Sequence, residues 1–166
     1  MLAAIALGSN LASRFGDRAA NLHAAIDRIA ALGTITAVSS FYDTAPVGLL
    51  DQPRFLNAAL LLDTQLLPLE LLQALLAIEA DMGRRRDLVA PKGPRVIDLD
   101  LLFVDDQILQ TPALTLPHPA IAERIFVLEP LAEIAPGWVH PVNGKTVVKM
   151  LAAIQSGHMK RPVEGP

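Results

Sequence analysis

The chain has 166 residues, which is the usual length of one domain. Its residues are 52% hydrophobic and 19% charged, a composition typical of a packed core and not of a disordered chain. The sequence contains no cysteine, which excludes disulfide scaffolds, thiol catalysis and cysteine-ligated metal centres. The net charge of −3 gives no overall attraction to nucleic acid or anionic membranes, so a polyanionic substrate would need a local basic cluster.

The sequence has no segment of the length expected for a membrane span. The longest run without Lys, Arg, Asp or Glu is residues 107–122, and three prolines and a histidine interrupt it. A spanning helix needs about 20 apolar residues. The apolar residues 1–7 have no basic residue before them and a glycine directly after them, which favours a core strand over a signal peptide. We therefore expect a cytoplasmic protein.

The hydrophobic pattern predicts alternating strands and helices. Apolar or β-branched runs indicate the strands, and apolar residues at helical spacing indicate the helices. Gly33 and Gly83 follow the two helical patterns, and Pro68 stands in the first turn of the second one. The predicted elements, in chain order, are a strand at 2–7, a helix at 17–32, strands at 34–44 and 55–64, a helix at 68–82 and a strand at 95–104.

This β-α-β-β-α-β order is typical of ferredoxin-like α+β sandwiches, in which helices pack on the faces of an antiparallel sheet. The residues that follow are expected to form a C-terminal extension. It would contain a short strand near 107–109, a helical segment after Pro119 and a last helix near 147–155. No internal repeat or change of composition marks a second domain, so we expect one domain over residues 1–166.

Two aspartates on the last predicted strand are the strongest indication of chemistry. Strand side chains alternate, so Asp98 and Asp100 share one face while Ile97, Leu99 and Leu101 share the other. Their Cα atoms would be about 6.6 Å apart, so the carboxylates could hold one cation or bracket a pair roughly 3.5–4 Å apart. The alternative is an exposed polar face without a ligand. For a site with only oxygen ligands, the expected ion is Mg²⁺.

The loop before this strand supplies the positive charge that the whole chain lacks. Arginine suits bidentate contacts with phosphate. A basic loop alone is usually only solvated, but next to paired aspartates it indicates a triphosphate site, because phosphoryl transfer depends mainly on charge neutralisation and alignment. The length of the loop also suits closure over a substrate. Its basic residues are Arg84, Arg85, Arg86, Lys92 and Arg95, against the single acid Asp87.

Several short runs fall in the order and spacing of a known family. The most specific is Gly-Pro-Arg at 93–95 followed by Asp-Leu-Asp at 98–100; the weaker runs are Ala6–Leu11, Ser39–Tyr42, Asp51–Pro53, Phe55–Ala59 and Leu116–Pro119. With these runs, residues 1 to about 142 resemble the 6-hydroxymethyl-7,8-dihydropterin pyrophosphokinases. Lys92 stands where many members of that family have tryptophan.

The resemblance implies an Mg²⁺-dependent enzyme of folate biosynthesis. It would transfer pyrophosphate from ATP to 6-hydroxymethyl-7,8-dihydropterin and release AMP. The resemblance further implies that Asp98 and Asp100 bind two Mg²⁺ ions, and that Arg84 and Arg95 meet the ATP phosphates with Arg84 nearest the transfer step. The other residues implied for the ATP site are Glu79, Arg86, Leu101, Thr115, His118 and Arg124.

The resemblance also implies a pterin site. In it, Asn57 would read the hydrogen-bonding edge of the pterin, helped by the backbone near Thr44 and Val47. Phe126 would stack on the pterin ring, and Phe55 stands where tyrosine is common. The implied partners are these two small molecules, with no nucleic acid and no membrane, and a monomer suffices.

A binding module of the same fold is the alternative. It would bind RNA or a regulatory metabolite and have no transferase activity. RNA-binding versions need stacked aromatic residues on their central strands. Aromatic residues make up only 4% of this chain, and the predicted strands at 2–7 and 55–64 carry no such motif. The sequence therefore favours the enzyme.

Overall fold

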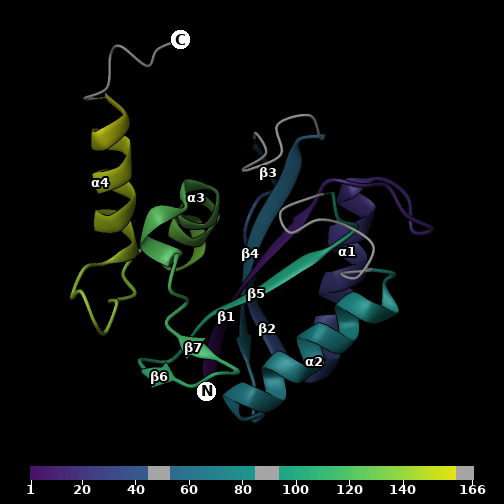
Figure 1. The fold of residues 1–166 in the computed structure, drawn as a ribbon, viewed down its shortest axis with the longest axis horizontal. Helices are drawn as coiled ribbons and strands as arrows, with labels where there is room; N and C mark the ends of the chain where they lie inside the picture. Colours follow the sequence, from purple (N-terminus) through teal and green to yellow (C-terminus); the bar gives the residue numbers. More distant parts are fainter. Residues whose placement is uncertain (45–52, 85–93, 160–166) are drawn as a thin grey trace.

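The computed structural model describes residues 1–44, 53–84 and 94–159. Its centre is a five-stranded antiparallel sheet with the strand order β2-β4-β1-β5, and β3 pairs with β4 beyond the end of β2 (Figure 1). The strands are β1 (Leu2–Ser9), β2 (Thr34–Val38), β3 (Tyr42–Thr44), β4 (Phe55–Asp63) and β5 (Asp98–Val104).

Helices cover both faces of this sheet. α1 (Arg18–Ile29) and α2 (Pro68–Asp81) pack on one face, and α3 (Ile125–Ile134) packs on the other (Figure 1). The order of elements and strands confirms the ferredoxin-like α+β class, with α3 as part of the C-terminal extension. The remaining elements are the 3-10 helices Ala30–Leu32 and Ile121–Glu123, the two short strands β6 (Leu109–Gln110) and β7 (Thr115–Leu116), and α4 (Val147–Met159).

The first two helices begin at residues suited to cap them. Asp17 caps α1 by accepting a hydrogen bond from the backbone N–H of Ala20 at 3.0 Å. Pro68 opens α2, and the Glu70 carboxylate accepts the backbone N–H of Leu67 at 2.9 Å. Within the described ranges, no helix combines the length and the apolar character that crossing a membrane requires.

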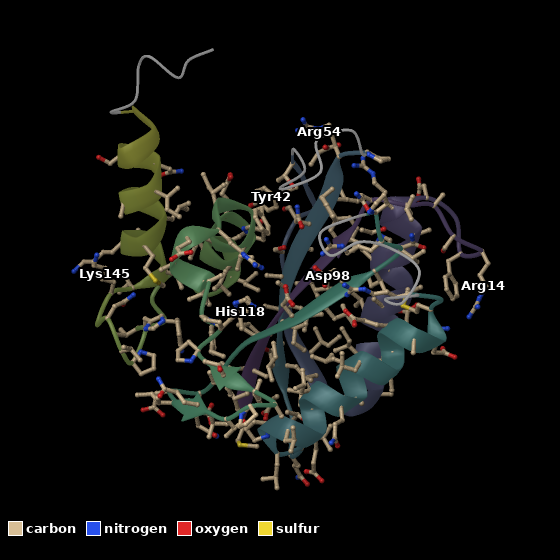
Figure 2. The ribbon with its side chains drawn as sticks, viewed as in Figure 1. Arg14, Tyr42, Arg54, Asp98, His118 and Lys145 are labelled. Carbon is tan, nitrogen blue, oxygen red and sulfur yellow. The ribbon has the colours of Figure 1, made fainter. Side chains whose placement is uncertain are left out.

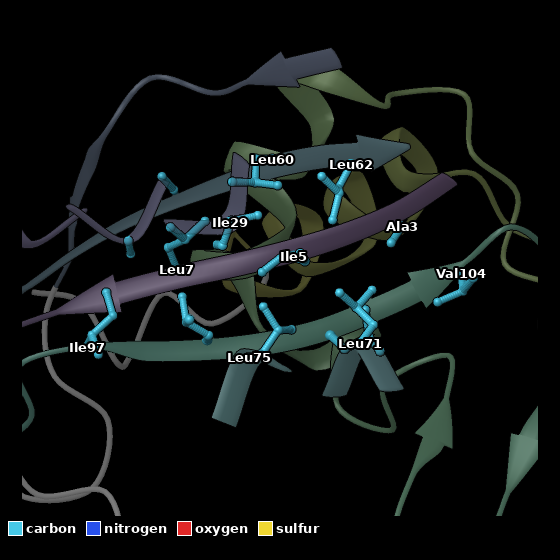
Figure 3. Packing of buried hydrophobic residues seen from close by; sticks show 14 of the residues in the cluster. Ala3, Ile5, Leu7, Ile29, Leu60, Leu62, Leu71, Leu75, Ile97 and Val104 are labelled. Atoms are coloured by element: carbon cyan, nitrogen blue, oxygen red, sulfur yellow. The ribbon is translucent and has the colours of Figure 1, made fainter. Parts of the chain in front are cut away.

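β1 is buried on both of its faces and so belongs to two hydrophobic clusters. Its residues Ala3, Ile5 and Leu7 face α1 and α2, where they pack against side chains such as Leu71 and Leu75 of α2 (Figure 3). Residues 4 and 6 face α3 and are both alanine. The small side chains on this second face allow α3 to approach the sheet closely.

The strand predicted at 34–44 is two strands, because Ser39 interrupts the pairing with β4. Its N–H donates to the carbonyl of Ala59 at 2.9 Å, and its hydroxyl accepts the N–H of Ala59 at 2.9 Å. The hydroxyl thus takes the place of a backbone carbonyl, and β3 starts three residues later at Tyr42. The strand predicted at 95–104 likewise begins later, at Asp98, because residue 95 bonds to the backbone and side chain of Asn10 instead.

The C-terminal extension differs from its predicted form in detail. The strand predicted at 107–109 is β6, which pairs with a strand that the pattern did not indicate, β7. The helical segment predicted after Pro119 is α3, preceded by one 3-10 turn. The last helix starts at the predicted Val147 and continues beyond the predicted end, to Met159.

Leu60 lies at the centre of β4 and is fully buried, so Leu60→Ala should leave a cavity in the core. We expect the free energy of unfolding to fall by about 2–5 kcal/mol. Urea unfolding followed by the fluorescence of the single tryptophan, Trp138, measures it. Leu69→Ala, at an exposed position of α2, is the matched control and should change stability by less than about 1 kcal/mol. Equal losses in both variants would contradict the assigned core.

Candidate active site

One end of the sheet has small and polar side chains on the face toward α3. Residues paired across adjacent strands point to the same face. The register therefore places two residues from each of three strands together on that face. We call this set the site floor; its members are Ala6 and Gly8 of β1, Asn57 and Ala59 of β4, and Asp98 and Asp100 of β5.

Gly8 leaves room for the side chain of Asn57, its neighbour on β4. A Cβ atom on Gly8 would lie 3.0 Å from Oδ1 of Asn57 and 3.7 Å from the ring of Phe55. The amide nitrogen of Asn57 donates a hydrogen bond to Oγ1 of Thr44 on β3. Glycine at position 8 and threonine at position 44 therefore fix the orientation of a nearly buried amide.

Asp98 lies between two arginines, in the central part of Figure 2. Nη1 of Arg84 donates to its Oδ1 at 2.8 Å, and Nη1 of Arg95 donates to its Oδ2 at 3.1 Å. The same Arg84 nitrogen also donates to Glu79 at 2.7 Å. Because these side chains are mostly removed from water, their charges depend on one another for compensation.

Glu79 is the most deeply buried charge of this network, with a side chain only 2% exposed. Its Oε2 accepts the N–H of Leu99 on β5 at 2.7 Å in addition to the contact with Arg84. Glu79 thus connects the end of α2 to β5 and orients Arg84. The resemblance implied that Glu79 lines the nucleotide site, and this stays a prediction.

Arg84 keeps one donor that the described residues do not use. Its Nε is buried and has no hydrogen-bond partner within the described ranges. A buried polar group without a partner is costly, and such groups in native structures often serve a ligand. Glu79 and Asp98 orient the Arg84 guanidinium, so this buried donor is held in a fixed position.

Asp100 is less well compensated than Asp98. Its nearest cation, Nη1 of Arg124, is 3.9 Å from Oδ2. Burial, and next the charge of Asp98, raise the pKa of Asp100 to about 7, although 31% of its side chain remains exposed. The ionised form of such a buried carboxyl group is disfavoured unless a further positive charge lies close to it.

A cavity of about 270 Å³ lies beside Asp100, along the outer edge of β5. It is bounded by α2 on one side and by the segment around β7 on the other. Most of its lining residues are apolar, which is typical of a small-molecule site with a few polar groups for orientation. The lining residues are Leu72, Leu76, Leu99, Asp100, Leu101, Pro112, Ala113, Leu114, Thr115, His118 and Pro119.

His118 contributes a neutral imidazole to this cavity. Its backbone N–H donates to the carbonyl of Leu102 at 2.8 Å, and its Nδ1 accepts the N–H of Ala120 at 3.1 Å. Burial, and next the positive charge of Arg124, lower its pKa. With Nδ1 used as an acceptor, the proton of the neutral ring is on Nε2, which can donate to a ligand.

Two aromatic rings with arginines over them stand next to the site floor. The Arg95 guanidinium lies 5.3 Å from the centre of the Phe55 ring, and that of Arg124 lies 5.7 Å from the centre of the Phe126 ring. Phe126 is half-buried in the first turn of α3 and packs against the hydrophobic cluster on that face. These contacts place a flat apolar surface close to each cation.

The structure gathers most of the predicted site residues around one end of the sheet. Asp98 and Asp100 share a face, while Ile97, Leu99 and Leu101 point into the opposite core, as the alternation predicted. Two predicted residues, Val47 and Arg86, lie outside the described residues. So does most of the basic loop, including Lys92.

Sequence reasoning missed Asn10 as part of the site. Asn10 is 1% exposed; its Oδ1 accepts the N–H of Arg95 at 2.7 Å, and its Nδ2 donates to the carbonyl of Pro53 at 3.1 Å. It therefore joins the segments that lead into β4 and β5. The signal was a polar residue at the end of a core strand, which entered the sequence analysis only as part of the run Ala6–Leu11.

The residues present fit Mg²⁺ bound together with phosphate. Among the described side chains, no three of His, Cys, Asp and Glu are grouped as a complete metal cage. Mg²⁺ commonly uses one or two carboxylates and completes its coordination with water and substrate phosphates. Asp98 and Asp100 supply two carboxylates, and the raised pKa of Asp100 shows that its ionised form is disfavoured here, a cost that a bound cation would offset.

Comparison with known proteins gives a consistent result. A model of the 7,8-dihydro-6-hydroxymethylpterin-pyrophosphokinase (HPPK) family matches residues 4–136. The 2-amino-4-hydroxy-6-hydroxymethyldihydropteridine pyrophosphokinase of Pseudomonas aeruginosa is 45% identical over 90% of this chain and 89% of its own length. The protein of the same name from Methylorubrum extorquens is 44% identical over 95% of this chain and 96% of its own length.

The fold is also similar to that of solved structures. The crystal structure of wild-type Plasmodium falciparum HPPK-DHPS with pteroate matches 99% of this chain with a TM-score of 0.75 and 16% sequence identity. This chain spans 44% of that longer chain. At such low identity the match supports the ferredoxin-like fold alone.

Replacing Glu79 separates a structural role from a nucleotide contact. Glu79→Ala leaves the nearly buried Arg84 without its shortest ion pair, so the free energy of unfolding should fall by about 3–5 kcal/mol. Urea unfolding measures this loss. Glu123→Ala, on the exposed 3-10 turn before α3, is the control and should have little effect. An unchanged stability in Glu79→Ala would contradict the structural role.

Proposed function

The chain belongs to the 7,8-dihydro-6-hydroxymethylpterin-pyrophosphokinase family, and from this premise we propose how its residues divide the work of the reaction. It catalyses the transfer of pyrophosphate from ATP to 6-hydroxymethyl-7,8-dihydropterin in folate biosynthesis, a reaction that releases AMP. The observation that carries the assignment of roles is the site floor, which has Asp98 and Asp100 at one side and Asn57 at the other.

ATP binds in the cavity along β5. The apolar lining, including Leu101, accepts the adenosine, and Thr115 and the Nε2–H of His118 supply polar contacts. This orientation directs the phosphates toward Asp100, which borders the cavity. Arg124 stands next to that carboxylate and, with Arg84 and Arg95, provides the positive charge. Arg86 would add to it from outside the described residues.

Asp98 and Asp100 would hold the Mg²⁺ that accompanies ATP, and we propose two ions. When bound there, Mg²⁺ supplies neutralisation of the phosphate charge and a fixed template for the phosphate oxygens. Two features of the protein favour such binding. Asp98 is oriented by hydrogen bonds from two arginines, and the negative charge of Asp100 is only weakly compensated by neighbouring cations.

The pterin alcohol occupies the other side of the site floor. The amide of Asn57 faces the hydrogen-bonding edge of the pterin, and its orientation is preset by Thr44 and by the space over Gly8. The rings of Phe126 and Phe55 provide apolar surfaces for the flat substrate. Val47 would contribute from outside the described residues.

The transfer is a direct displacement at phosphorus. The hydroxymethyl oxygen of the pterin attacks the β-phosphorus of ATP and releases its proton to solvent. The bond between the β-phosphorus and the oxygen that bridges to the α-phosphate breaks, and AMP departs with that oxygen. Arg84 stabilises the negative charge that builds on the phosphoryl oxygens, because Glu79 and Asp98 already orient its guanidinium in the folded state. Alignment of the two substrates on one face of the sheet supplies the remainder of the rate acceleration.

We propose that residues 1–166 act as a single domain and as a cytoplasmic monomer. Both hydrophobic clusters share one sheet, which supports a single cooperative unit. The argument against the alternative, an RNA-binding module, comes from membership of an enzyme family and not from a feature of the sheet.

Removal of the Asp100 carboxylate tests the assignment of roles. Asp100→Ala should lower kcat/KM by about 1000-fold or more, because it removes a proposed metal ligand. Stability should not fall, since an acid whose pKa is raised by folding opposes folding once it is ionised. The assay is AMP release from ATP with and without the pterin alcohol, and Asp106→Ala in the exposed turn after β5 is the control. Undiminished transfer by folded Asp100→Ala would refute the assignment.

Gly8→Ala tests the proposed pterin side of the floor. The added methyl group would meet Oδ1 of Asn57 at 3.0 Å and displace the amide, so KM for the pterin should rise roughly tenfold while KM for ATP stays within about twofold. Gly137→Ala is the matched control, because a Cβ there meets no atom within 4 Å. Equal effects on both substrates would count against the assignment of Asn57.

A further inference from the structure

β3, which leads to the proposed pterin site, has little hydrophobic anchoring. It has three residues, Tyr42–Thr44, all of them half-buried or exposed. It pairs with β4 in the register Tyr42↔Asn57 and Thr44↔Phe55. A strand this short at the edge of a sheet depends on contacts beyond its own backbone pairing for a fixed position.

Glu133 of α3 supplies such contacts on one face. Both of its carboxylate oxygens accept the N–H of Ser40 at 3.0 Å, and Oε2 also accepts the hydroxyl of Ser40 at 3.1 Å. Oε1 accepts the hydroxyl of Tyr42 at 2.7 Å. One carboxylate thus binds three donors on the segment that enters β3, and hydrogen bonds to a charged acceptor are the strong kind.

The opposite face of β3 is held by arginines. Asp43 accepts from Nη2 of Arg18 on α1 at 3.0 Å and from Nε of Arg54 at 2.7 Å. These hydrogen bonds lower the pKa of Asp43, and those from Tyr42 and Ser40 lower the pKa of Glu133. Both carboxylates are therefore ionised at neutral pH, and β3 is fastened from both sides by charge-assisted contacts.

The contact on the α3 side joins two parts of the proposed site. α3 carries Phe126 in its first turn and Glu133 in its last, while β3 carries Thr44, the partner of Asn57. We propose that Glu133 is a positioning residue for the pterin: by holding Ser40 and Tyr42 it sets the place of Thr44 and Asn57 relative to Phe126. This inference rests on the pterin site proposed above and adds a residue that touches neither substrate.

Glu133→Ala should raise KM for the pterin alcohol roughly tenfold, as expected for the loss of hydrogen bonds to a charged group. KM for ATP should stay within about twofold, because the nucleotide cavity lies along β5. Glu133→Gln keeps an acceptor and should fall between Glu133→Ala and the unmodified chain. Asp106→Asn removes one charge from an exposed turn and is the control.

Tyr42→Phe provides a second variant that acts through the same contact. Alone it should raise KM for the pterin by less than Glu133→Ala does, and combined with Glu133→Ala it should add almost nothing, which a double-mutant cycle measures. Thermal unfolding of each variant shows whether the fold is intact. An unchanged KM for the pterin, or parallel changes for both substrates, would overturn the role of Glu133. A lack of transfer by the unmodified chain would instead overturn the proposed function.

Discussion

The compensation of charge around Arg84 is the constraint on which the rest of the site depends. Glu79, Arg84, Asp98 and Arg95 form a continuous chain of ion pairs in a region largely removed from water. Such networks often add little net stability, but they permit few arrangements, because any displacement exposes an uncompensated charge. The network therefore defines where the end of α2, the start of β5 and the beginning of the basic loop meet. The geometry of the proposed phosphate site follows from that meeting point.

β5 can serve the core and the site together because it is an edge strand with an alternating pattern. Its apolar residues Leu99 and Leu101 contact the core under α1 and α2, and both also border the cavity at the strand's outer edge. The intervening Asp98 and Asp100 face the other side, where Ala6 and Gly8 of β1 leave space. A rigid strand thereby presents carboxylates at fixed spacing without interrupting the hydrophobic packing.

The features that the sequence predicted correctly are those that depend on local periodicity. The alternation around Asp98 and the helical spacing in α1 need only neighbours in the chain, and both were confirmed. The division of residues 34–44 into two strands depends on the hydroxyl of Ser39 and its partner on β4, twenty residues away. The contact of Tyr42 with Glu133 spans 91 residues. Periodicity carries no information about such pairs, so they became visible only in the folded chain.

The position of β5 also bears on self-association of the protein. An exposed strand edge can pair with a second chain, and proteins commonly discourage this with charged side chains along the edge. On β5, which is an edge strand, some of the backbone groups along the edge are already used: the N–H of Leu99 donates to Glu79, and the carbonyl of Leu102 accepts the N–H of His118. Glu79 and His118 therefore leave a second chain fewer backbone groups to pair with, and a nucleotide in the adjacent cavity would cover part of the same edge.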